Sequence, residues 1–113
     1  MIKKKLALVV ILLLATTANA EMSPKKEICL TISTMAQNVM SMRQIGMSIA
    51  EPLAISQKFA DDGTSSGAKT NEIMDGIIMD AYSNDLRYSE QMKTTSINEF
   101  ATKYYLGCMT SID

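Results

Sequence analysis

The amino-acid sequence predicts an all-α fold, a small bundle of three to four helices closed by one disulfide. Apolar residues recur at steps of three and four along several segments, which is the period of one helix face. No segment alternates apolar and polar residues over the length that a half-buried strand needs. The two cysteines, Cys29 and Cys108, stand near the beginning and the end of the chain that follows the N-terminal segment.

The first twenty residues have the layout of a secretory signal peptide. Lysines at Lys3–Lys5 precede an apolar run, Leu6–Ala15, and small residues lead to an Ala18-x-Ala20 cleavage site. The apolar run is too short for a bilayer span, which takes about 20 apolar residues. We expect cleavage after Ala20, a single helical domain over 21–113, and no transmembrane segment after cleavage; the alternative is an uncleaved anchor.

The type of signal indicates the compartment of the protein, and the charge of the chain limits the kinds of partner that it can bind. The short, Lys-rich signal is similar to bacterial signals, and this resemblance implies the periplasm of a Gram-negative cell. After Ala20 the chain has twelve acidic and eight basic side chains, which give a net charge of −4. No basic patch is evident in the sequence, so nucleic acid is not expected as a partner.

The first helix is expected to begin after Ser23, an N-cap followed by Pro24 at the first helical position. It is expected to end near Gly46, a residue type that commonly closes helices. Its apolar face is expected to comprise Ile28, Ile32, Met35, Val39, Met42 and Gly46. Polar residues, with Gln44 among them, are expected on the opposite face.

A short second helix is expected over 49–60, opened by a capping box that pairs Ser48 with Glu51. Residues 61–69 are turn-forming or small, so they are expected to form the principal loop. The third helix is expected to be capped by Thr70 or Asn71. Its acidic side chains are expected to form a solvated face made of Glu72, Asp75 and Asp80.

The dipeptide Asn84-Asp85 is expected to end the third helix, and Ser89 to cap the fourth. In an oxidising compartment Cys29 and Cys108 are expected to form a disulfide, the alternative being two free thiols for metal or redox work. The disulfide would close a loop of about 80 residues, worth roughly 4 kcal/mol in the chain-entropy model. It would join the start of the first helix to the end of the last, as antiparallel neighbours in a four-helix bundle.

No catalytic constellation is evident, so neither an enzyme nor a cofactor is expected. The sequence has no histidine, the commonest general base and a common metal ligand. The nine methionines after Ala20 are interpreted chiefly as core residues. Because thioethers also bind Cu(I), a methionine-based copper site stays open. Met40 and Met47, seven residues apart and off the apolar face, are the candidate surface pair.

The segment Arg43-Gln44-x-Gly46 is the most motif-like part of the chain. At the edge of the apolar face, Arg43 is expected either to pair with a carboxylate, such as Glu51 or Asp80, or to anchor a partner protein. Exposed tyrosines are amphipathic contact residues. The residues expected to form an interaction site are Met40, Arg43, Gln44, Met47, Tyr82 and Tyr88.

The order of several short elements resembles that of small exported bacterial and prophage-associated helical proteins of unknown function. The elements are Cys29, Met40, Arg43-Gln44-x-Gly46, Ala81-Tyr82, Arg87-Tyr88, Phe100, Tyr104 and Cys108. The chain departs from the pattern after the Ala-Tyr pair, where Asn84-Asp85-Leu86 replaces the expected proline. The resemblance covers most of the chain after Ala20 and implies a layout without a mechanism.

The sequence therefore predicts a small periplasmic, non-enzymatic protein that binds another protein or the envelope. Export, small size, the lack of a catalytic constellation, and helices rich in methionine and tyrosine favour this hypothesis. One alternative is an acid-activated periplasmic chaperone, in which protonation of paired carboxylates loosens the fold. The other is Cu(I) binding by methionines.

Overall fold

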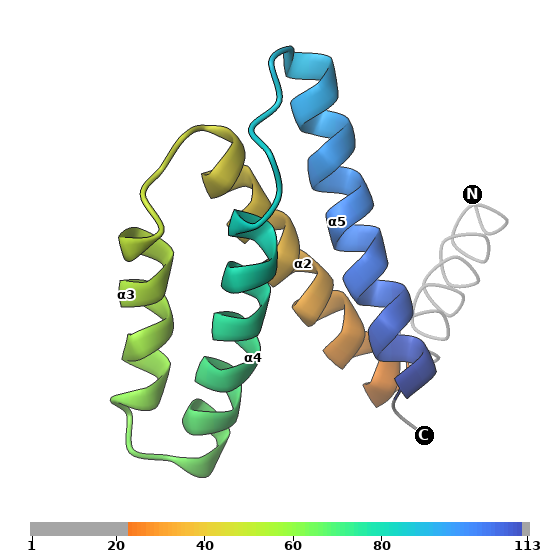
Figure 1. Ribbon diagram of the computed structural model, residues 1–113. Coiled ribbons are helices and arrows are strands. Elements are labelled where there is room, and N and C mark those ends of the chain that lie inside the picture. The colour runs from red at the N-terminus through yellow and green to blue at the C-terminus, as the bar shows by residue number, and fades with distance from the viewer. Residues whose placement is uncertain (1–22, 112–113) are drawn as a thin grey trace, which may run out of the picture.

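The computed structural model describes residues 23–111 and contains four helices, with no strand in that range. They are α2 (Pro24–Gln44), α3 (Ala50–Ala60), α4 (Ser65–Tyr82) and α5 (Glu90–Ser111) (Figure 1). The predicted all-α bundle is confirmed. The predicted signal peptide and its cleavage site lie outside the described residues.

Helix α2 begins and ends as the sequence predicts. The Ser23 Oγ accepts a hydrogen bond from the backbone N–H of Lys26 at 3.2 Å, which caps the first turn. Gly46 has a φ of +83°, a left-handed conformation that favours glycine. The N–H of Gly46 bonds to the carbonyl of Arg43, and the next N–H, from Met47, bonds to the carbonyl of Met42, each at 3.0 Å. This pair of bonds is a Schellman motif, which satisfies the last carbonyls of the helix.

The start of α3 differs from the predicted capping box. The Ser48 Oγ accepts from the N–H of Ala50 at 3.3 Å, while the N–H of Glu51 bonds to the Ser48 backbone carbonyl at 3.1 Å. No side chain caps α3 at its N-cap position, Ile49. The prediction of a capping box is therefore wrong. Ser48 lies one residue before the N-cap position, Ile49, so its hydroxyl bonds to the N–H of Ala50 and not to that of Glu51.

Helix α4 begins at Ser65 and is capped by Thr64, so the predicted cap at Thr70 or Asn71 is wrong. The Thr64 Oγ1 accepts from the N–H of Gly67 at 2.9 Å, and the carboxylate of Asp62 accepts from both the N–H and the hydroxyl of Thr64. These hydrogen bonds from Thr64 lower the pKa of Asp62 against a small opposing effect of burial. The predicted loop is shorter than expected because its small residues fit a helical turn, where Gly67 lies against the carbonyl of Phe59.

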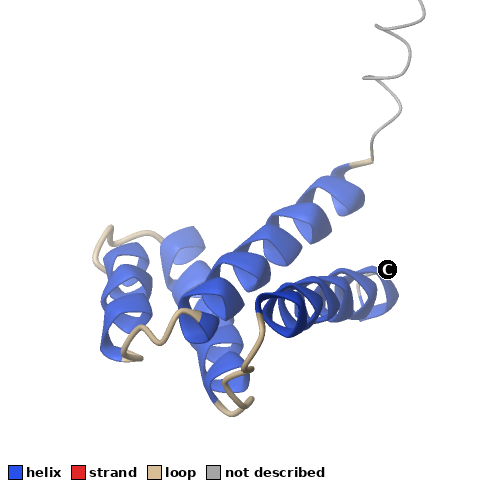
Figure 2. Cartoon of the chain, turned by 90° about the horizontal axis from the view of Figure 1, so that it is seen from above, coloured by secondary structure: helices blue, strands red, loops and turns tan. Residues whose placement is uncertain are grey.

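The bundle is organised around α2, which packs against both α5 and α4 (Figures 1 and 2). Helix α3 packs chiefly against α4, so the two form a hairpin at the side of the molecule. The core where α2, α4 and α5 meet comprises Ala36, Val39, Met40, Met74, Ile77, Ile78, Ala81 and Phe100.

The buried surface of α2 is wider than the predicted apolar face. Ile32 and Met35, on the predicted apolar face, lie toward α4, but Met40 and Gln44 are each only 1% exposed and turn toward α5 and its preceding loop. The predicted exposure of Gln44 and Met40 is therefore wrong. The physical reason is that α2 has a neighbour on two sides, so a second stripe of side chains is buried. Ile28, which was predicted to be apolar core, is 52% exposed.

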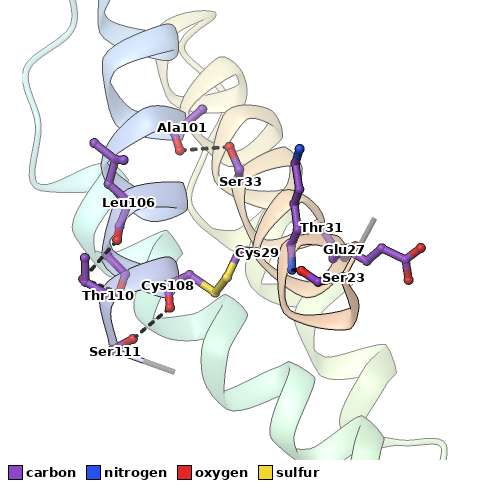
Figure 3. The surroundings of a disulfide bond; sticks show 12 residues. Ser23, Glu27, Cys29, Thr31, Ser33, Ala101, Leu106, Cys108, Thr110 and Ser111 are labelled. Atoms are coloured by element: carbon purple, nitrogen blue, oxygen red, sulfur yellow. Dashed lines mark hydrogen bonds between the residues drawn. A yellow bond between two sulfur atoms is a disulfide. The ribbon is translucent and has the colours of Figure 1, made fainter. Parts of the chain in front are cut away.

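The predicted disulfide is present and links Cys29 of α2 to Cys108 of α5, with the two Cα atoms 5.5 Å apart (Figure 3). Farther along the same pair of helices, the Ser33 Oγ donates to the carbonyl of Ala101 at 2.9 Å. These two links join early residues of α2 to late residues of α5. The predicted antiparallel pairing of the first and last helices is confirmed.

Two of the three acidic residues predicted to face water instead link helices. The Asp75 Oδ1 of α4 accepts from the hydroxyl of buried Ser56 of α3 at 2.6 Å. The Asp80 Oδ2 of α4 accepts from the Lys103 Nζ and the Tyr104 hydroxyl of α5, each at 2.7 Å. The prediction of a fully solvated face is wrong because both carboxylates lie where a neighbouring helix supplies a donor.

Candidate interaction surface

The buried side chain of Gln44 fixes the backbone of the loop between α4 and α5. Its Nε2 donates to the carbonyl of Asp85 at 3.0 Å, and its Oε1 accepts from the N–H of Arg87 at 2.9 Å. The same Nε2 lies 3.5 Å from the Met40 sulfur. A single amide thus satisfies a donor and an acceptor of an irregular segment, which has no helix ladder to satisfy them.

Arg43, the other half of the predicted motif, binds the same loop. Its Nε donates to the carbonyl of Asn84 at 3.0 Å, and its guanidinium lies 5.4 Å from the ring centroid of Tyr82. The predicted pairing of Arg43 with Glu51 or Asp80 is wrong. Among residues 23–111 the ion pair is between Lys103 and Asp80, and Arg43 has no carboxylate within ion-pair distance. The distance between Arg43 and the loop along the chain, about 40 residues, explains why its partner could not be read from the sequence.

Tyr82 links the last turn of α4 to the connection between α2 and α3. Its hydroxyl donates to the carbonyl of Met47 at 2.9 Å. Burial raises the pKa of Tyr82, with a smaller lowering by the charge of Arg43 and a smaller raising by Glu51. Tyr82 therefore stays neutral and donates a hydrogen bond at physiological pH, and it is half-buried rather than a free contact residue.

Five of the six residues predicted to contact a partner thus contribute to the interior of this end of the molecule. Gln44 and Met40 are buried, and the other three are half-buried: Arg43, Met47 and Tyr82. Tyr88, by contrast, is 98% exposed. The predicted motif acts on the protein's own loop, and that loop presents the exposed tyrosine.

Three apolar side chains lie exposed around a hollow of about 370 Å³ at this end. They are Ile45 (71% exposed), Leu86 (45%) and Tyr88, and we refer to them as the loop-end patch. The hollow is also lined by Gln44, Gly46, Arg87 and Lys93. Figure 1 shows that both contributing connections, α2–α3 and α4–α5, lie in the same upper part of the molecule.

Arg87 lies at the edge of the loop-end patch. It is not among the residues that the sequence predicts for an interaction site and is named there only as part of the Arg87-Tyr88 pair. Its Nε donates to the Ser96 Oγ at 3.1 Å, which orients the guanidinium along α5. Two further hollows adjoin it, one toward Phe100 and one along α5 toward Met92. Glu99 lines both of these, but no carboxylate of residues 23–111 lies within ion-pair distance of Arg87.

A second surface hollow lies between α2, α3 and α4. It consists of two adjoining parts of about 220 and 310 Å³, lined almost wholly by apolar side chains and threonines. Met35, Met42 and Met74 line the larger part, where Ile55 and Phe59 are partly exposed. The predicted Met40 and Met47 pair is not the place where methionines gather, and copper binding stays a prediction.

The fold and this surface define a disulfide-closed bundle of four helices with a structured, apolar end. Comparison with protein-family models, curated proteins and solved structures found no match for the chain. The resemblance to small exported and prophage-associated proteins therefore stays a prediction. Within residues 23–111, no helix has the length and hydropathy of a membrane-spanning segment.

Proposed function

We propose that the protein is an exported, non-enzymatic module that binds another protein of the periplasm or envelope through the loop-end patch. One observation carries the proposal: Tyr88 is 98% exposed beside two exposed aliphatic side chains, Ile45 and Leu86, on a loop whose backbone is bonded by buried Gln44. Tyrosine is one of the residue types, with tryptophan and arginine, that are enriched at the energetic centres of protein interfaces.

The way the loop is supported strengthens this proposal. An exposed loop usually loses conformational entropy when a partner orders it, and this loss weakens binding. Here three loop backbone groups, the carbonyls of Asn84 and Asp85 and the N–H of Arg87, are already bonded to side chains of α2. The loop-end patch is therefore ordered before binding. Export is supported by the signal-peptide layout and by the disulfide, which is typical of oxidising compartments.

Affinity capture from periplasmic extract tests the proposal when it compares matched variants of the mature, disulfide-intact protein. We expect the wild-type protein to retain a partner that the double variant Leu86→Ser, Tyr88→Ala loses. Leu106→Ser is the control, because Leu106 is 57% exposed on α5 near the disulfide, at the other end of the molecule. Equal retention by all three proteins would remove the loop-end patch from the proposal.

A second candidate, opening under acid, is favoured by Asp80. Burial raises the pKa of Asp80, but the hydrogen bonds from Lys103 and Tyr104 and the charge of Lys103 together hold it below its ordinary value of 3.8. A lowered native pKa means that the stabilisation is complete above the unfolded value and is lost as pH falls through the native value. Protonation below about pH 3.8 would therefore weaken the link between α4 and α5.

The chaperone candidate is tested by a client-aggregation assay near pH 3 and at pH 7. We expect Asp80→Asn, which removes the charge at every pH, to suppress aggregation at a higher pH than the wild-type protein does. Absence of suppression by both proteins at pH 3 would reject acid-activated chaperoning and leave the binding module as the function.

A further inference from the structure

The loop-end patch has a chemical asymmetry that bears on the partner. Its apolar walls are Ile45, Leu86 and Tyr88, and the charged residues that line the same hollow, Arg87 and Lys93, are both cations. The exposed carboxylates nearest in sequence, Asp85 and Glu90, do not line it. The mature chain as a whole carries a net charge of −4, so a hollow without a carboxylate is a local exception; Glu99 lines the two hollows on the other side of Arg87.

Arg87 is oriented and yet lacks a carboxylate. Its Nε is bonded to the Ser96 Oγ and its backbone N–H to Gln44, which together fix both ends of the side chain. The structure records no acceptor for its two terminal amino groups in residues 23–111. A guanidinium in this state matches a carboxylate, which it can bind through two parallel hydrogen bonds.

We infer that the loop-end patch binds a segment of a partner protein in which an aspartate or glutamate stands beside an apolar side chain, with the carboxylate on Arg87 and the apolar side chain between Ile45, Leu86 and Tyr88. The inference rests on the proposed function and names the chemistry of its partner. Lys93 adds a second positive charge to the hollow. This charge is expected mainly to speed the association of an acidic segment, whereas the oriented Arg87 is expected mainly to slow its dissociation.

Two other occupants fit the same surface less well. An anionic membrane attracts clusters of four to eight basic residues, whereas this hollow has two cations in an acidic chain. A second copy of the chain in a two-fold dimer would place the same patch on both sides of the interface. Arg87 and Lys93 of each copy would then face like charges, which disfavours the dimer.

Selection from a displayed library of random twelve-residue peptides tests the inference. The bait is the disulfide-intact mature protein, with Leu86→Ser, Tyr88→Ala as the counter-selection. We expect enriched peptides that carry Asp or Glu next to an apolar residue. For a synthetic peptide of the enriched sequence, Arg87→Gln is expected to lower the affinity about tenfold, and Arg87→Glu to abolish binding.

Two control variants separate charge from geometry. Ser96→Ala removes the hydrogen bond that orients Arg87 but keeps the charge, so it is expected to weaken binding about threefold. Leu106→Ser, at the far end of α5, is expected to leave the affinity unchanged. Replacing the peptide carboxylate by Lys is expected to restore binding to Arg87→Glu and to abolish it for the wild-type protein.

The outcomes distinguish this inference from the function on which it rests. Enriched peptides that lack an acidic residue, or an affinity that Arg87→Gln leaves unchanged, would overturn the inference while the binding function stands. No enrichment over the counter-selected variant would overturn both. Binding to vesicles with anionic lipid, or a dimer by sedimentation equilibrium that Arg87→Gln disrupts, would replace the acidic segment by one of the other occupants.

Discussion

The two ends of the α2–α5 pair are joined in different ways. At one end a covalent bond links Cys29 to Cys108, and at the other end Gln44 and Arg43 bind the loop before α5 by hydrogen bonds to its backbone. The disulfide acts mainly by restricting the unfolded chain, whereas the hydrogen bonds define the geometry of one folded segment. Both ends therefore contribute to stability, but only the hydrogen-bonded end defines the shape of the surface on which the loop-end patch lies.

The largest expected effect is the loss of the disulfide. The double variant Cys29→Ser, Cys108→Ser opens a loop with a sequence separation of 79, and the unfolded chain gains the entropy that the bond removed. We expect the free energy of unfolding to fall by about 4 kcal/mol, measured by urea denaturation. The loop at the other end should keep its structure in the folded fraction, so unchanged amide shifts at Asp85 and Arg87 would support the comparison. Loss of those shifts would show that the two ends are coupled.

The second largest effect is expected at Gln44. Gln44→Met keeps the volume of the side chain but removes its bonds to Asp85 and Arg87, and leaves two loop backbone groups without their partners. We expect a loss of about 2 kcal/mol, with faster amide exchange at Arg87. Gln37→Met, on the exposed face of the same helix, is the control and should change stability by less than about 0.5 kcal/mol. Equal effects at the two glutamines would contradict the role of Gln44.

A smaller effect is expected at Asp80, which joins α4 to α5 between the two ends. Because its native pKa lies below 3.8, Asp80→Asn should destabilise the protein at pH 7 and lose that effect as pH falls below the unfolded value. The Asp80 and Lys103 side chains are 34% and 58% exposed, so solvent screening limits the loss to about 0.5 kcal/mol. Glu72→Gln, on the exposed face of α4, is the matched control; a pH-independent difference would reject the assignment to Asp80.

The smallest effect on stability is expected at Tyr88. Its side chain is 98% exposed, so Tyr88→Ala should change the free energy of unfolding by less than about 0.5 kcal/mol. The same variant is expected to lose the partner in affinity capture, which separates binding from folding. A stability loss comparable with that of Gln44→Met would mean that Tyr88 supports the fold, and the patch would then need another contact residue.

Much of the fold could be predicted because its signals are local. Ser23 caps α2, Gly46 ends it, and Ser89 caps α5 through a 3.1 Å bond from the N–H of Met92, all within five residues along the chain. The period of the apolar residues predicts helices before any neighbour is known. The wrong start of α4 has the same origin, because Thr64 and Asp62 form a local cap among residues that are also typical of loops.

The candidate site was predicted less well, since it depends on residues distant in the sequence. Arg43 and Gln44 were rightly singled out as a motif, but their partners lie 41 to 43 residues away in the α4–α5 loop. The prediction of Met40 on the surface rests on a single apolar face of α2. Because α2 contacts both α4 and α5, a second stripe of its side chains is buried, and Met40 belongs to that stripe. Of the predicted contact residues, Tyr88 is the one that the fold leaves fully exposed.

The helical class, most helix ends and the pairing of the two cysteines follow from the sequence alone, because periodicity, capping and a single cysteine pair require no knowledge of neighbours. The burial of side chains on α2 and the loop that Gln44 binds depend instead on how the helices pack. Burial and hydrogen bonding are properties of a residue's neighbours, and those neighbours are brought together when α4 and α5 both pack against α2.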